Sequence, residues 1–352
     1  METPEIKDIF LKNVCPCLDF QVHEVEHCEE VTQWGKANFI WKVVCKTERG
    51  QETFFIKHAR AQIRRSDVPE EIRNVFLDPA RCFSESDFLH YLEGLWGTGV
   101  VPKVLYTNRD EFYFVMTDVS RGSPLLVEEF GAFRAHPETA PFVGKCFGLL
   151  HRETFGSDID FCASDLWRER MTAFYNEYWL SIGVRAVLGD EIVDEFYHVF
   201  TDEHSCVMWG DPVYRNIFTH PDNAVSFVDF DHTFRYDPAV DNGMLLAHWI
   251  WMMAHPTNEQ IRADARKFIE GYWPAYLAEV GRLGSDEENR IFERSIRWAG
   301  VYLLSRTNGR SGSYFKDTPE WEAAVRDTGK DLFTTQTGEV ARVLSACHRA
   351  SS

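Results

Sequence analysis

The chain has 352 residues, with 37 Lys and Arg against 55 Asp and Glu, so its formal net charge is −18. At roughly 150 residues per domain, this length predicts about two domains. The acidic balance disfavours generic attraction to nucleic acid or to an anionic membrane surface, and a content of 44% hydrophobic and 14% aromatic residues excludes a disordered chain. We therefore expect a compact protein with neither a nucleic-acid nor a membrane partner.

The cysteines and the N-terminus indicate a reducing compartment. Nine cysteines form an odd set without CxxC spacing, which favours neither a disulfide framework nor a structural zinc site. The segment 1–12 carries acids and lacks the basic start and apolar core of a signal peptide. No run approaches the roughly 18 apolar residues of a membrane span. We expect a cytoplasmic location.

The first part of the chain is predicted to be mainly β. Aromatic and β-branched runs separated by turn-like segments indicate four strands, at Phe39–Cys45, Thr53–Lys57, Val104–Tyr106 and Phe112–Met116. One helix is expected at Ser84–Leu95, with Ser84 as its N-cap and Gly97 beyond its end.

After about residue 120 the pattern becomes helical. The predicted helices are Pro141–Thr154, Ala163–Gly183, Asp190–Thr201, Met244–Ala254, Asn258–Leu283, Asp286–Leu304 and Pro319–Phe333. Short strands are expected only at Val207–Trp209, Ile217–Thr219 and Val225–Asp229. We thus predict a β-rich domain at 1–119 and a larger helical domain at 120–352, with a ligand site in the cleft along which they meet.

Four polar residues in the region 207–241 carry the strongest chemical signal. Asp211 is followed by Asn216 five residues later, by Asp229 and by Asp231. Singly, each would be an ordinary turn residue. Phosphoryl transfer needs a carboxylate for the attacking hydroxyl and oxygen ligands for Mg²⁺, and this ordered set on loops after short strands supplies both.

These residues resemble motifs of the kinase-like phosphotransferases, the superfamily of aminoglycoside phosphotransferases, choline kinases and methylthioribose kinases. Gly210, Asp211 and Asn216 match its catalytic loop, and Asp229-Phe230-Asp231 echoes the metal motif of methylthioribose kinase and the hydroxytryptamine kinases, the nearest resemblance. The resemblance implies an α+β, bilobal protein-kinase-like fold with a small β-rich N-lobe and a larger, mainly helical C-lobe. It implies ATP and Mg²⁺ as cofactors, Asp211 as the catalytic residue, and Asn216, Asp229 and Asp231 as metal ligands.

The N-terminal part extends the resemblance. Gly35 and Asn38 are similar to the family's reduced nucleotide loop, Lys57 to its phosphate-binding lysine, and Arg81 and Glu85 to its Arg-x-x-x-Glu pattern, in which the Glu holds the lysine. A solvated edge lysine and a helix first-turn acid are the alternatives.

Two further segments are matched by position. Met116 and Asp118 lie where the family's connection between lobes binds adenine through its backbone. Arg306, with Arg310 nearby, resembles the family's substrate-binding arginine pair, although Ser305 occupies the first position of that pair. An arginine on a helix surface is the alternative.

Two residues near the catalytic loop depart from the family's pattern, and a third residue is expected to support the loop. Trp209 replaces the family's His, and we expect it to preserve packing and to remove a polar contact with the neighbouring loop. Asp231 replaces a Glu and is one methylene shorter. His151 is expected to be a structural partner of the catalytic loop rather than a participant in the reaction.

We therefore expect an ATP-dependent small-molecule O-kinase, an enzyme whose partner is a small alcohol. An antibiotic-inactivating or aminoglycoside phosphotransferase and a catalytically inactive nucleotide-binding protein of the same fold remain alternatives. A protein kinase is disfavoured, because only eleven residues separate Asp229 from Asp241, too few for a peptide-holding segment, and no Ala-Pro-Glu motif follows.

Overall fold

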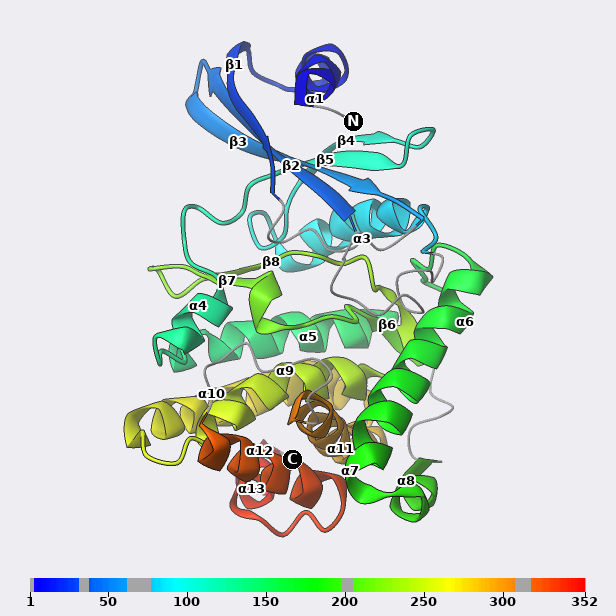
Figure 1. The fold of residues 1–352 in the computed structure, drawn as a ribbon, viewed down its shortest axis with the longest axis vertical. Coiled ribbons are helices and arrows are strands. Elements are labelled where there is room, and N and C mark those ends of the chain that lie inside the picture. The colour runs from blue at the N-terminus through cyan, green and yellow to red at the C-terminus, as the bar shows by residue number, and fades with distance from the viewer. Residues whose placement is uncertain (1–2, 32–37, 62–76, 198–204, 308–317, 352) are drawn as a thin grey trace. The chain divides into compact units, whose positions relative to one another are not determined.

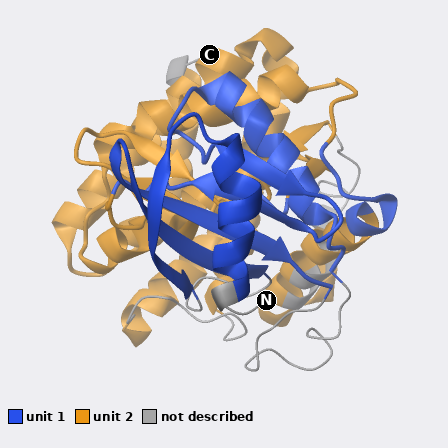
Figure 2. Ribbon diagram, turned by 90° about the horizontal axis from the view of Figure 1, so that it is seen from above, with its two compact units in different colours: residues 1–121, 161–168, 230–232 blue, residues 122–160, 169–229, 233–352 orange. Residues whose placement is uncertain are grey.

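The computed structural model describes residues 3–31, 38–61, 77–197, 205–307 and 318–351. The chain forms two compact units, coloured separately in Figure 2. Unit 1 contains residues 1–121 together with the later segments 161–168 and 230–232, and unit 2 contains 122–160, 169–229 and 233–352. The chain therefore passes from unit 2 into unit 1 between Asp229 and Phe230, inside the predicted metal motif.

Unit 1 is built on a five-stranded antiparallel sheet in the order β1-β2-β3-β5-β4. Its strands are β1 (Val22–Glu30), β2 (Asn38–Thr47), β3 (Gly50–Ala59), β4 (Val104–Asn108) and β5 (Tyr113–Thr117). The register of β2 and β3 runs from Asn38 opposite Ala59 to Thr47 opposite Gly50. The positive φ of Gly50, +111°, suits a glycine at this tight hairpin.

Helices lie on both faces of this sheet (Figure 1). The N-terminal segment consists of α1 (Thr3–Ile9), η1 (Phe10–Val14) and η2 (Cys15–Cys17). Its Ile6, Phe10 and Val14 are fully buried in one core with Val43 and Ile56 of the sheet. The opposite face carries α3 (Arg81–Trp96), towards which Lys57 points from β3. The alternation of side chains along β3 thus separates a packed apolar face from the face that carries the chemistry.

Unit 2 is mainly helical. Its helices are α4 (Leu126–Gly131), η3 (Pro137–Thr139), α5 (Ala140–Thr154), α6 (Asp165–Ala173, which begins in unit 1), η4 (Phe174–Val184), α7 (Arg185–Leu188), α8 (Asp190–Tyr197), α9 (Pro238–Met253), α10 (Glu259–Val280), η6 (Gly281–Leu283), α11 (Ser285–Thr307), α12 (Pro319–Phe333) and α13 (Glu339–Ser351). Between α8 and α9 lie η5 (Tyr214–Asn216) and two antiparallel strand pairs, β6 (Cys206–Met208) with β9 (Phe234–Tyr236) and β7 (Ile217–Thr219) with β8 (Val225–Phe227). These short elements hold the loops of the candidate site.

The predicted fold class, with a β-rich first part and a larger helical second part, is confirmed. Ser84 is not an N-cap, because α3 begins at Arg81 and Ser84 is buried inside the helix. The start of α9 was predicted six residues too late, since Asp237-Pro238 resembles a turn but here caps the helix: Asp237 accepts a hydrogen bond from Ala239 N, and Pro238 occupies N1. Strands β1 and β9 and helices α1, α4 and α13 were not individually predicted.

Within the described ranges, no helix has both the length and the apolar character that crossing a bilayer requires.

Candidate active site

A buried ion pair forms the centre of the site in unit 1. Lys57 of β3 donates to Glu85 of α3, with Nζ 2.8 Å from Oε1 and 2.7 Å from Oε2, and the side chains are 3% and 1% exposed. Glu85 Oε1 also accepts the backbone N–H of Phe230 at 3.1 Å. One carboxylate therefore orients the lysine and fixes the segment that follows Asp229. The sequence-based pairing of Lys57 with Glu85 is present in the structure.

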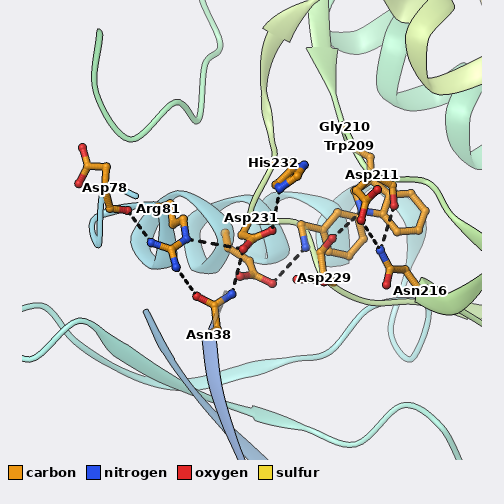
Figure 3. Close-up of polar contacts among 12 residues, drawn as sticks. Asn38, Asp78, Arg81, Trp209, Gly210, Asp211, Asn216, Asp229, Asp231 and His232 are labelled. Atoms are coloured by element: carbon orange, nitrogen blue, oxygen red, sulfur yellow. Dashed lines mark hydrogen bonds and ion pairs between the residues drawn. The ribbon is translucent and has the colours of Figure 1, made fainter. Parts of the chain in front are cut away.

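A second polar cluster in unit 1 joins Asn38, Arg81 and Asp231 (Figure 3). Asn38 Nδ2 donates to Asp231 Oδ2 at 2.9 Å, and Arg81 Nη2 donates to Asn38 Oδ1 at 2.6 Å. Burial by itself raises the pKa of Asp231, but Lys57, His232, Arg81 and the Asn38 hydrogen bond outweigh it and hold this pKa below its usual range. Asp231 is thus a stable carboxylate bound by protein groups, and metal ligation by Asp231 stays a prediction.

In unit 2, Asp211 and Asn216 lie together on the loop after β6. Asn216 Nδ2 donates to the backbone oxygen of Asp211 at 3.0 Å and to its Oδ2 at 3.1 Å. Arg215 Nη2 lies 3.6 Å from the same Oδ2. Among the described residues, nothing hydrogen-bonds to the side-chain oxygen of Asn216, so this oxygen is available to a ligand.

The β7–β8 hairpin places Asp229 beside this loop. Ile217 pairs with Phe227, and Val228 N donates to Asn216 O at 3.0 Å, which brings Asn216 and Asp229 to the same end of the hairpin. Asp229 has a left-handed φ of +68°, a conformation in which Asp is enriched, and its backbone oxygen accepts Trp209 Nε1 at 2.8 Å. Trp209 preserves the packing, as expected, because it is fully buried. The expected loss of a polar contact was wrong, because the indole donates to the neighbouring loop.

The backbone before Asp211 is held by a buried carboxylate. Asp241 Oδ2 accepts Trp209 N at 2.7 Å and Asp241 Oδ1 accepts Gly210 N at 2.8 Å. His151 Nε2 lies 3.3 Å from Asp241 Oδ2, and its Nδ1 lies 3.0 Å from the Tyr276 hydroxyl. His151 is therefore part of the support of the catalytic loop, as predicted.

We expect Asp241→Asn to destabilise this support. The amide nitrogen would face a backbone N–H, and leaving a buried donor unsatisfied costs about 1–3 kcal/mol. The expected result is a loss of that size in the free energy of unfolding, measured by urea titration, together with lower activity. Asp327→Asn, at a 77% exposed position, is the matched control and should change neither. An unchanged unfolding midpoint for Asp241→Asn would show that the bonds to Trp209 and Gly210 do not support the loop.

The other predicted site residues are distributed as follows. Met116 lies in β5, and Asp118 follows that strand, with its carboxylate accepting Ser120 N at 2.7 Å. In unit 2, Arg306 is buried on α11, with its guanidinium 5.4 Å from the Trp179 ring centroid and 4.9 Å from that of Tyr302. Arg306 is therefore not an exposed surface arginine. Gly35 and Arg310 lie outside the described residues.

Sequence reasoning did not identify two residues that contact the predicted site. Arg215 directly precedes Asn216 and pairs with Asp211. Its position four residues after Asp211 could have indicated that the two side chains lie close together. Asp241 entered the sequence analysis only as the end of the short segment after Asp229, and its role as acceptor for two backbone N–H groups depends on the position of α9.

The donor chemistry of unit 2 fits Mg²⁺. Carboxylate and amide oxygens are the ligand types that Mg²⁺ prefers, and it is usually bound by one or two carboxylates with substrate phosphates and water. Asp229 and Asn216 offer such oxygens at one end of a hairpin. In the part of the chain that the structure describes, no group of three or more His, Cys, Asp or Glu side chains is placed to hold a metal ion.

Residues 43–282, more than half of the chain, match the sequence profile of a family described as the phosphotransferase enzyme family. This match confirms the superfamily expected from the motifs, whereas the nearer resemblance to methylthioribose kinase stays a prediction. No curated protein matches the chain.

Among solved structures, similarity extends to an ethanolamine kinase from Plasmodium vivax, at 15% identity over 96% of this chain and 89% of that one, with a TM-score of 0.46. A choline kinase from Streptococcus pneumoniae shares 11% identity over 94% and 99% of the two chains, with a TM-score of 0.45. An amicoumacin kinase shares 12% identity over 95% and 93%, with a TM-score of 0.49.

Proposed function

Because the chain belongs to the phosphotransferase enzyme family, we propose that it is an ATP- and Mg²⁺-dependent kinase that transfers the γ-phosphate to a hydroxyl of a small molecule. The observation that carries this proposal is the arrangement around Asp211. Its carboxylate is held by Asn216, whose own side-chain oxygen is bonded to none of the described residues, on a loop fixed by Asp241. Such a loop can present one carboxylate and one amide oxygen to reactants without reorganising.

Asp211 orients the acceptor hydroxyl and takes its proton as the bond to phosphorus forms. A carboxylate is a weak base compared with an alkoxide, so most of its contribution is orientation, and the proton transfers late. Arg215, beside Asp211, offers a positive charge near the transferred group. Positioning and electrostatic stabilisation supply most of the catalysis in this reaction class.

Lys57 binds phosphate oxygens of ATP. Its orientation by Glu85 supports this role, because a buried ammonium held by one carboxylate keeps a fixed direction. Gly35 and Asn38 contribute to nucleotide binding at the start of β2, and the backbone at Met116 and Asp118 binds adenine. Asn216 and Asp229 hold Mg²⁺, which when bound neutralises charge on the phosphates.

The acceptor is a small molecule. Eleven residues separate Asp229 from Asp241, and α9 begins at Pro238, which leaves a short segment for binding a peptide substrate. We assign Arg306 and Arg310 to binding of the acceptor molecule. Sugars, thiosugars, amino alcohols and alcohol-bearing natural products, including aminoglycosides, are the candidate acceptors.

The function is tested by ADP formation with a panel of alcohols: methylthioribose, choline, a hydroxytryptamine and an aminoglycoside. We expect at least one alcohol to stimulate ADP release above the rate with water alone, and we expect excess EDTA to abolish this stimulation and added Mg²⁺ to restore it. A thermal shift with Mg-ATP without transfer to any alcohol, in this panel or in a metabolite extract, would favour the inactive nucleotide-binding alternative. Stimulation that persists in EDTA would contradict the Mg²⁺ dependence.

A further inference from the structure

Asn38, Arg81 and Asp231 form a closed set of contacts in unit 1. Asn38 donates to Asp231 and accepts from Arg81, while Arg81 Nε lies 3.6 Å from the same Asp231 Oδ2 that accepts from Asn38. The three residues are 6%, 1% and 6% exposed. Asn38 and Asp231 are 193 positions apart, so this set ties the start of β2 to the segment after Asp229.

Arg81 is itself rigidly held. Its Nη1 donates to Arg60 O at 2.9 Å and to Asp78 O at 3.0 Å. The Asp78 carboxylate in turn accepts the hydroxyl of Ser164 at 2.6 Å. With Nη1 anchored on two backbone oxygens, Nη2 and Nε keep a fixed direction towards Asn38 and Asp231, which suits the planar, multiply donating guanidinium (Figure 3).

We propose that Asn38, Arg81 and Asp231 act as a latch that positions the 230–231 segment, and that Asp231 is a positioning residue rather than a ligand of Mg²⁺. This inference rests on the proposed function. The latch reaches the nucleotide through Glu85: Phe230 N, adjacent to Asp231, donates to the carboxylate that orients Lys57. A shift of residues 230–231 would therefore disturb Lys57, the residue assigned to the phosphates.

The contacts of Asp231 favour the latch over metal ligation. Oδ2 accepts from Asn38 and faces Arg81, and Oδ1 lies 3.9 Å from His232 Nε2. A metal ion bound through Oδ2 would compete with the buried hydrogen bond from Asn38 and would place a second cation beside the Arg81 guanidinium, so the contacts of this oxygen favour the latch. Asp229, by contrast, belongs to unit 2 and lies at the end of the β7–β8 hairpin with Asn216.

An exchange of the two side chains distinguishes the two roles. In Asp231→Asn the latch loses its carboxylate, and in the double variant Asn38→Asp/Asp231→Asn the amide at 231 can donate to the carboxylate at 38, which also faces Arg81 Nη2. The probe is the nonhydrolysable analogue AMP-PNP, and its Kd is measured by calorimetry with Mg²⁺ and with EDTA. Asp87→Asn, which breaks an exposed ion pair with Arg109 on the same helix as Arg81, is the control.

The latch predicts that Asp231→Asn weakens AMP-PNP binding about tenfold both with Mg²⁺ and with EDTA, as expected when a hydrogen bond to a charged group becomes one between neutral groups. It predicts that the exchange variant returns to within about threefold of the wild type, since a carboxylate again accepts the hydrogen bond and faces Arg81. The latch would be overturned if Asp231→Asn lost affinity for AMP-PNP only with Mg²⁺. It would also be overturned if the exchange variant bound AMP-PNP no more tightly than Asp231→Asn does.

Two controls keep the outcome interpretable. If Asp231→Asn does not fold, the exchange variant alone tests the latch. A variant that folds and binds AMP-PNP like the wild type supports the latch, and any other result contradicts it. If the wild-type chain does not bind AMP-PNP, the proposed function itself fails. If the wild-type chain binds AMP-PNP but the exchange variant does not recover this affinity, only the latch is refuted.

Discussion

Replacement of Asp211 by Asn is expected to lower the rate of phosphoryl transfer by roughly 100- to 1,000-fold, the loss seen when one preorganised polar group is removed from a reacting centre. The substitution keeps the size of the side chain and removes the group that accepts the proton. Asn216 and Asp229, the residues assigned to the metal, are unchanged. The affinity for Mg-AMP-PNP should therefore stay within about threefold of the wild type, because the substitution leaves the proposed nucleotide contacts in place.

The matched control is Asp222→Asn in the turn of the β7–β8 hairpin. Asp222 accepts a backbone N–H from Ala224, and Asn makes the same turn contact, so the hairpin that carries Asn216 should remain intact. We expect wild-type turnover in this variant. Near-normal turnover of Asp211→Asn would refute the catalytic assignment of Asp211.

Replacement of Lys57 by Met is expected to lower both stability and nucleotide binding. It leaves the Glu85 carboxylate buried without its cation, and breaking a buried pair in this way costs about 3–5 kcal/mol. We expect a loss of that order in the free energy of unfolding, measured by urea titration, and a loss of nucleotide binding measured by calorimetry.

The double variant Lys57→Met/Glu85→Leu separates stability from function. An apolar pair of similar size removes the uncompensated charge and should recover at least half of the lost stability, although Phe230 N loses its acceptor. Nucleotide binding should not return, because the ammonium is still missing. Recovery of binding in the double variant would refute the role of Lys57, whereas a Lys57→Met variant as stable as the wild type would show that the pair contributes no stability.

The exposed pair Arg109–Asp87 provides the comparison for this experiment. Its side chains are 61% and 50% exposed, and the median contribution of such pairs is about 0–1 kcal/mol. Asp87→Asn should therefore leave both the unfolding midpoint and nucleotide binding almost unchanged.

Local sequence patterns were sufficient to predict most of the fold. Alternating aromatic and β-branched residues predicted β2 and β3, and helical periodicity predicted α5, α10 and α12, because these signals are contained within each element. The start of α9 was missed because Asp-Pro is typical both of turns and of helix N-termini, and the choice depends on packing. Strand β9, with the sequence Phe-Arg-Tyr, carries a charged residue at its centre and was not recognised as a strand, whereas the equally short β6, β7 and β8 were predicted.

The site was predicted where its residues are close in sequence or share a known spacing. Asp211 and Asn216 are five positions apart and contact each other, and Lys57 and Glu85 meet across a strand and the following helix. The Asn38–Asp231 contact could not be predicted in this way, because it joins positions separated by most of the chain. Asp231 was assigned to the metal from its position two residues after Asp229, but its buried neighbours are known only from the fold.

Transfer of the γ-phosphate to a small alcohol, with Asp211 as the catalytic residue, can be followed with [γ-³²P]ATP and a deproteinised metabolite extract. Wild-type protein with Mg²⁺ is expected to move label into an organic phosphate that alkaline phosphatase releases, and Asp211→Asn, at the same nucleotide occupancy, is expected to leave the label in ATP. Equal labelling by both proteins, or labelled inorganic phosphate as the only product of the wild type, would contradict the claim.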